Sequence, residues 1–184
     1  MGVNHVRAYI HLYSAGDVAF LTWRALELTL MFEIPQPLHP ALIHFPIVLI
    51  FLGCGAAALS LITDRWNIRS WTVVLLVLAA IGTMAATWSG GEARHAVGVL
   101  PPVTAQLVHD HAEWGETTRN IAIATAIAAV AGLWIKAGPR LVLAFRFLLF
   151  AMTLIATLSV IQTGRLGGEM VYHHDVGISK DASP

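Results

Sequence analysis

The chain has 184 residues, of which 57% are hydrophobic and only 12% are charged, and its mean hydropathy is +0.69. A single small core cannot bury so large an apolar fraction, so the composition excludes a water-soluble globular domain and indicates a membrane protein. The formal net charge is zero and the isoelectric point is about 7.1, so the charge balance does not suggest a nucleic-acid partner.

Residues 1–35 contain apolar residues, but charged residues interrupt them too often for a membrane span. Asp17, Arg24 and Glu27 fall on one stripe of a helix, which is typical of a helix lying at the membrane surface. No basic segment followed by an apolar core and a small-residue cleavage site marks a signal peptide. We therefore expect an amphipathic or disordered extension, with Met31 as an alternative start.

Four later stretches approach or exceed the roughly 18 to 20 residues that a helix needs to cross the hydrocarbon of a bilayer. They cover about residues 41–62, 71–89, 116–135 and 141–161. All but Trp23 of the six tryptophans lie near their ends, at the headgroup level that an indole ring prefers. These patterns predict an all-α integral membrane protein, a four-transmembrane-helix bundle over residues 36–178 with a mobile tail at 179–184.

The short connections between the predicted spans carry the charges that orient a membrane protein. Arg65 and Arg69 follow the first span, and Lys136 and Arg140 follow the third. Basic residues in short loops are retained on the cytoplasmic side. In a bacterium we therefore expect the inner membrane, with both termini and most histidines facing the periplasm. The lipid bilayer is one expected partner, and a homo-oligomer is a further possibility that the sequence leaves undecided.

The sharpest local motif lies at the start of the first span, in residues 38–47. Pro40 suits the first turn of a helix, whereas Pro46 lies inside the helix and leaves a carbonyl without its usual donor. His44 lies beside this point, within the apolar segment, and needs a partner there. A hydrogen bond across the bundle and ligation of a metal or haem are the two interpretations. His39 is expected to cap the helix or lie at the interface.

Histidines and acidic residues gather again before the third span. His109 and Glu113 are four residues apart and share a helix face, and a carboxylate beside an imidazole fixes the tautomer that binds a metal. A solvated helix start, where the dipole favours acidic residues, is the competing interpretation. Arg119 is expected inside the hydrocarbon, paired with a glutamate or with an anionic group such as a haem propionate.

The candidate site residues form two overlapping sets. For a haem b they are His44, His109, His111 and Arg119. For a transition metal they are His44, His95, His109, His111 and Glu113. After the fourth span, glycines at 164, 167 and 168 predict that the helix ends and that the tail folds back, which adds His173 or His174.

The predicted cytoplasmic half of the spans is almost free of ionisable side chains. Its exception is Arg146, which is close enough to the helix end to extend to the interface. Channels and ion transporters need intramembrane polar groups in series, so this pattern argues against them. The sequence also contains no nucleophile motif, helix-borne metalloprotease motif or phosphate-binding loop, and no enzyme activity is predicted.

The two ends of the membrane domain resemble a known family. Residues 39–47 match a motif H-P-x-x-x-H-F-P-I, and residues 163–172 match T-G-x-x-G-G-x-x-V-Y. These motifs are similar to those of a DUF2231-like family of small bacterial four-helix membrane proteins of unknown function. The resemblance covers about residues 36–178 and implies the membrane location and the fold, but no activity. The resemblance implies a glycine at position 175, where this sequence has Asp175 instead.

The leading functional hypothesis is an integral membrane protein that transfers electrons through a b-type haem or a mononuclear metal near the outward face. Its ligands would be His44 with His109 or His111, and His95 in reserve, and its partner a redox or membrane-complex protein. The alternative is a non-catalytic membrane subunit or anchor whose outward loops bind a partner protein.

Overall fold

The computed structural model describes residues 38–177, together with Phe20, Trp23 and Arg24. The chain divides into two units, Met1–Gln36 and Pro37–Pro184. In the first unit, the Arg24 guanidinium lies 5.7 Å from the centroid of the Phe20 ring. The rest of the expected amphipathic extension and the tail at 179–184 fall outside the described residues.

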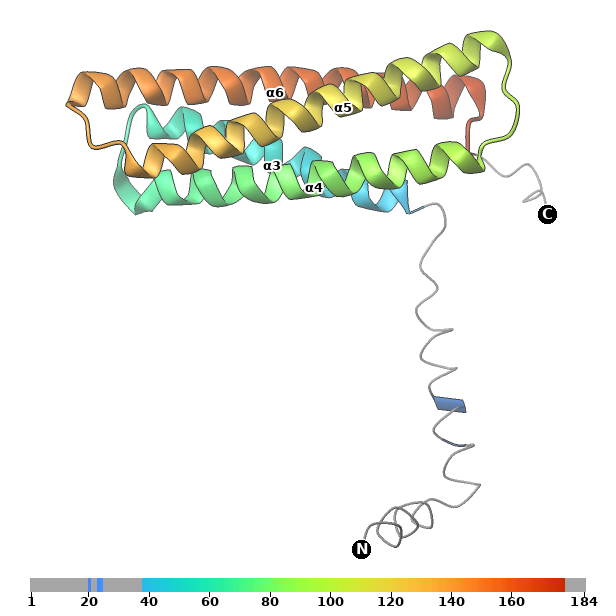
Figure 1. The fold of residues 1–184 in the computed structure, drawn as a ribbon, viewed down its shortest axis with the longest axis horizontal. Coiled ribbons are helices and arrows are strands. Elements are labelled where there is room, and N and C mark those ends of the chain that lie inside the picture. Colours follow the sequence, from blue (N-terminus) through green and yellow to red (C-terminus); the bar gives the residue numbers. More distant parts are fainter. Residues whose placement is uncertain (1–19, 21–22, 25–37, 178–184) are drawn as a thin grey trace, which may run out of the picture. The chain divides into compact units, whose positions relative to one another are not determined.

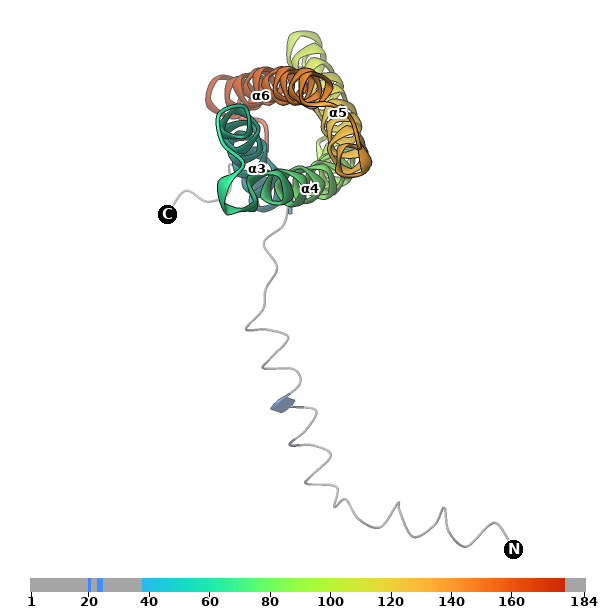
Figure 2. The same ribbon diagram turned by 90° about the vertical axis from the view of Figure 1, so that its left-hand side faces the viewer.

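The described part of the second unit, residues 38–177, contains four long helices and two single turns of 3₁₀-helix. The long helices are α3 (His39–Ser60), α4 (Ile68–Ala96), α5 (Pro102–Ala131) and α6 (Pro139–His174), and the short turns are η1 (Arg65–Asn67) and η2 (Gly132–Trp134). The long helices lie side by side (Figure 1) and form a ring when viewed end-on (Figure 2). Around this ring α3 and α5 each pack against α4 and α6. The prediction of an all-α four-helix bundle is confirmed.

Three segments of the bundle are long and apolar enough to cross a membrane: His39–Ser60, Arg65–His95 and Pro139–His174. Large apolar side chains such as Phe51, Leu148 and Ile155 face outward, where lipid tails solvate them. Small residues make up most of the interior. Among the described residues, half of the buried apolar side chains are alanine, and every buried polar side chain is a serine or threonine. Small residues let helix backbones approach closely in lipid, where no hydrophobic effect drives them together.

The helices continue past the predicted spans at one end of the bundle. The polar region predicted as an outward loop is mostly helical, because α4 runs on to Ala96 and α5 already begins at Pro102, which suits the first turn of a helix. The prediction that glycines end the fourth helix is wrong, since α6 passes through them to His174. The helix stops at Asp175, whose φ of 52° is left-handed, so a glycine is the residue expected there.

Neighbouring helices run antiparallel, so the bundle has two distinct ends. One end contains the first turns of α3 and α5 and the last turns of α4 and α6, and we call it the histidine end. The other end contains the α3–α4 and α5–α6 connections, residues 61–67 and 132–138, and we call it the arginine end.

Close packing between α3 and α4 leads to a stability prediction. A Cβ atom added to Gly53 would lie 2.8 Å from Cδ2 of the buried Leu76, whereas one added to Gly55 would meet nothing within 4 Å. We expect Gly53→Ala to lower the free energy of unfolding by about 1–3 kcal/mol through overpacking. Gly55→Ala should be neutral or stabilising by up to about 1 kcal/mol, because alanine favours a helix.

Thermal unfolding of the two variants in one detergent checks this prediction. Equal melting temperatures for Gly53→Ala and Gly55→Ala would contradict the close α3–α4 contact.

Candidate functional site

His39, the first residue of α3, is anchored to α4. Its Nδ1 atom lies 3.0 Å from the carbonyl oxygen of Ala86 and 3.1 Å from Oγ of Ser89. A carbonyl only accepts, so Nδ1 carries the proton and donates it. Ser89 Oγ also donates to the Ala86 carbonyl, at 3.0 Å. The neutral imidazole therefore keeps its lone pair on Nε2.

His111 is anchored to α6 in the same way. Its Nδ1 atom lies 3.0 Å from the carbonyl oxygen of Thr163, so Nδ1 donates and Nε2 again keeps the lone pair. The Thr118 hydroxyl, about two turns after His111 on α5, lies 2.7 Å from Ser159 Oγ and 3.1 Å from Thr163 Oγ1, so hydroxyl contacts tie α5 to α6.

The imidazoles of His39 and His111 come together at the histidine end. They belong to α3 and α5, which lie at opposite corners of the bundle in the end-on view of Figure 2. Their ring centroids are 6.3 Å apart, and the ring planes meet at 83°. Both rings donate from Nδ1 to a backbone carbonyl. This is the contact that usually orients a metal-ligating histidine and leaves its other nitrogen free to bind. The donor set therefore suits a metal centre with two imidazole ligands.

Each imidazole also packs against a glycine that lies four residues after its carbonyl acceptor. A Cβ on Gly90 would lie 3.0 Å from Cε1 of His39, and one on Gly167 would lie 3.0 Å from Cε1 of His111. The side chain at position i+4 of a helix lies beside the carbonyl of residue i, as the serine and threonine bonds to that carbonyl demonstrate. Glycine at this position leaves the carbonyl open to a donor from another helix.

The equivalence of the two halves is visible in the sequence. Gly90-Gly91-Glu92 in α4 and Gly167-Gly168-Glu169 in α6 are the same tripeptide, and each starts four residues after the carbonyl that a histidine contacts. The α3–α4 and α5–α6 hairpins thus make matching half-sites. Sequence reasoning missed His39 as the partner of His111, although this repeated tripeptide was the signal that links them.

The structure places the other candidate residues away from this pair. His44 was expected to find a partner inside the bundle, but it lies exposed on the outer surface of α3. His95, His109 and Glu113 are also exposed. Among the described residues, no three histidine, cysteine or acidic side chains gather closely enough to hold a metal ion. The ligand roles assigned to these four residues stay predictions.

Arg119 and the C-terminal histidines also have defined positions. Arg119 is half-buried, and its Nε and Nη2 atoms donate to Oδ1 of Asn120 at 3.2 and 3.1 Å, rather than pairing with a glutamate in the described part of the chain. His174 reaches the histidine end because α6 continues, and its Nδ1 lies 3.4 Å from the Thr104 hydroxyl. His173 is exposed.

Burial lowers the pKa of His111, which precedes the apolar segment predicted at 116–135, and the hydrogen bond to Thr163 only partly opposes this effect. The neutral form, which is the form that binds metals, is therefore favoured in the folded protein.

This lowered pKa predicts a pH dependence of stability. Below the ordinary histidine pKa of about 6.5, the unfolded chain binds a proton at His111 that the folded chain resists, so stability is lost as the pH falls. We expect the melting temperature to fall between pH 7.5 and pH 5, and to fall less in His111→Asn, which keeps a donor but does not titrate. The same slope in both proteins would contradict the burial of this ring.

A second prediction concerns the glycine contact. In Gly167→Ala the new methyl group pushes against the His111 ring, whereas a Cβ on Gly164, one turn earlier, meets nothing within 4 Å. We expect Gly167→Ala to shift the ¹⁵N resonances of the His111 imidazole and Gly164→Ala to leave them in place. Unchanged resonances in both variants would show that the ring does not rest on α6.

Comparison with known proteins assigns the chain to a family. The family model described as "Predicted membrane protein (DUF2231)" matches residues 35–180, which is most of the chain. Neither a curated protein nor a solved structure matches it. The resemblance noted from the two end motifs is confirmed, and with it the assignment to the membrane. The chain is an integral membrane protein and belongs to the DUF2231 family.

Proposed function

We propose that the protein is a membrane electron carrier that holds one b-type haem between His39 and His111. The observation that carries this proposal is the pair of imidazoles, each tied by Nδ1–H to a backbone carbonyl and each with Nε2 free. His39 and His111 would hold the haem iron through these free Nε2 atoms. When bound, the haem supplies one-electron exchange between its ferric and ferrous forms.

The short separation of the two imidazole rings supports joint binding of one group. One bound group could be held by both histidines only if the two imidazole rings lie close together inside the bundle. The observed distance between the His39 and His111 centroids is 6.3 Å.

The surroundings of the pair support a single site at one membrane face. Both histidines belong to the histidine end, and the basic loops at the opposite end predict that the histidine end faces the periplasm. We therefore place the electron exchange at the periplasmic face of the inner membrane, with a redox protein on that side as the partner.

The test is the optical spectrum of the purified protein, loaded with haem and measured before and after dithionite. We expect one haem per chain and a Soret band that shifts on reduction, with the low-spin spectrum of two histidine ligands. His39→Ala and His111→Ala should each lower haem affinity at least about tenfold or leave a high-spin, five-coordinate iron.

His44→Ala is the matched control, because it removes an exposed imidazole from the same helix as His39. It should keep the haem and the low-spin spectrum. If the parent protein binds no haem, or if His44→Ala loses it while His39→Ala keeps it, the proposed ligand pair is wrong. A protein without haem whose elemental analysis also finds no stoichiometric metal favours the anchor function instead.

A further inference from the structure

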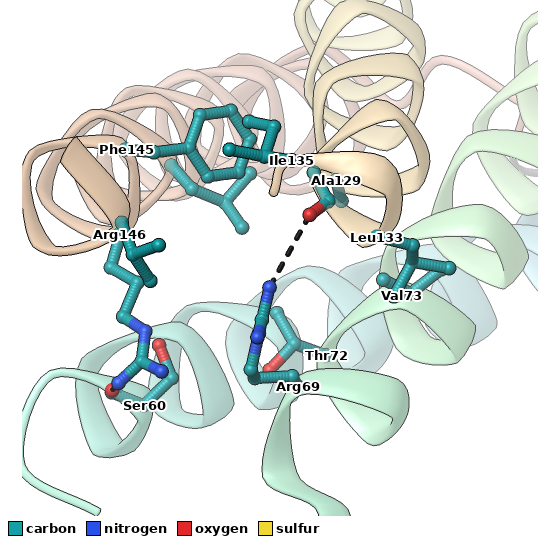
Figure 3. A pocket seen from close by; sticks show the side chains of 12 residues that line it. Ser60, Arg69, Thr72, Val73, Ala129, Leu133, Ile135, Phe145 and Arg146 are labelled. Carbon is teal, nitrogen blue, oxygen red and sulfur yellow. Dashed lines mark hydrogen bonds between the residues drawn. The ribbon is translucent and has the colours of Figure 1, made fainter. Parts of the chain in front are cut away.

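The arginine end of the bundle contains a cavity that is independent of the histidine pair. It has a volume of about 30 Å³, enough for about two water-sized groups. Apolar side chains form most of its wall, including Leu133, Phe145 and Leu149, whereas Arg69 and Arg146 supply its charged groups (Figure 3).

Arg146 was expected to extend toward the interface, and its side chain, only 15% exposed, reaches the end of α3 and the α3–α4 connection. Nη1 donates to the Ser60 carbonyl at 2.8 Å, and Nη2 pairs with Asp64, whose own side chain is 66% exposed. The Nε atom is buried and has no hydrogen-bond partner within the described residues. Protein atoms cover this Nε, so Arg146 contributes to the cavity through the positive charge of its guanidinium.

Arg69 lines the same cavity from the first turn of α4. Its Nη2 atom donates to the carbonyl of Gly132 at 3.3 Å, the contact drawn as a dashed line in Figure 3. A guanidinium has five N–H donors, so Arg69 retains donors for a further acceptor.

The arginine end carries an excess of positive charge at the level of the lipid headgroups. Its basic residues are Arg65, Arg69, Lys136, Arg140 and Arg146, against the single acidic residue Asp64 in its two connections and the adjoining helix turns. The exposed indoles of Trp66, Trp71 and Trp134 lie in the same region, and tryptophan concentrates at the membrane–water interface. A phosphate of a surrounding lipid therefore lies at the depth of the cavity.

We propose that this cavity binds the phosphate of an anionic phospholipid. Phosphate oxygens accept from the remaining donors of Arg69, the nearby charge of Arg146 adds to the attraction, and an acyl chain covers the apolar wall between α5 and α6. The volume accommodates phosphate oxygens rather than a whole headgroup. Basic pockets between transmembrane helices recognise anionic headgroups in this way.

The experiment is native mass spectrometry of the full chain in a non-ionic detergent, with phosphatidylglycerol, phosphatidylcholine or inorganic phosphate added separately. We expect retention of phosphatidylglycerol above phosphatidylcholine and no retention of inorganic phosphate. Arg69→Gln should weaken phosphatidylglycerol binding at least about tenfold, the effect of losing a charge-assisted hydrogen bond. Arg140→Gln is the matched control, because it removes an exposed charge from the same end that does not line the cavity.

Two further variants probe Arg146. Arg146→Gln should also lose the lipid, and Arg69→Gln carries the test if that variant does not fold. Asp64→Asn removes the carboxylate that competes for Arg146 and should strengthen lipid binding. Equal lipid affinity of Arg69→Gln and Arg140→Gln overturns the proposal. Retention of inorganic phosphate without retention of phosphatidylglycerol also overturns it, and assigns the cavity to a free anion.

Discussion

The close approach of antiparallel helices within each hairpin is the constraint on which the rest of this structure depends. In lipid, helices associate through packing and hydrogen bonds, and alanine, glycine, serine and threonine line these interfaces. At Gly90 and Gly167 the approach is close enough for an imidazole to reach a carbonyl that already belongs to the helix ladder. This contact of an imidazole with a glycine and a backbone carbonyl occurs once in each hairpin. The helix packing and the orientation of the histidines therefore have one physical origin.

Much of the fold could be predicted from the sequence, because apolar length is a direct measure of membrane-spanning helices. The helix ends at the histidine end could not. A glycine in isolation weakens a helix, and three of them after the fourth span predicted a turn. In the bundle, Gly167 instead faces the His111 ring, and this packing outweighs its low helix propensity. Apolar length therefore identifies α3, α4 and α6 as able to cross a membrane, whereas α5, which contains the span predicted at 116–135, is not among these three. Nor does apolar length show where a helix stops.

The site was harder to predict than the fold, because depth along a helix does not reveal which way a residue faces. His39 and His44 are five residues apart, about 140° around the helix, so they cannot both face the bundle interior. Burial in the hydrocarbon favoured His44, yet the residue in the first turn is the one that reaches α4. His111 was among the candidates because acidic residues surround it, whereas its contact in the structure is a backbone carbonyl.

The confinement of each imidazole contact to a single hairpin has a consequence for biogenesis. His39 and its acceptor both lie in the segment from α3 to α4, and His111 and its acceptor lie in the segment from α5 to α6. The first half-site can therefore be complete in the bilayer while the ribosome is still translating the second hairpin. Docking of the two hairpins is then the step that brings the two imidazole rings together. A group that binds both rings would stabilise the association of two hairpins that inserted independently.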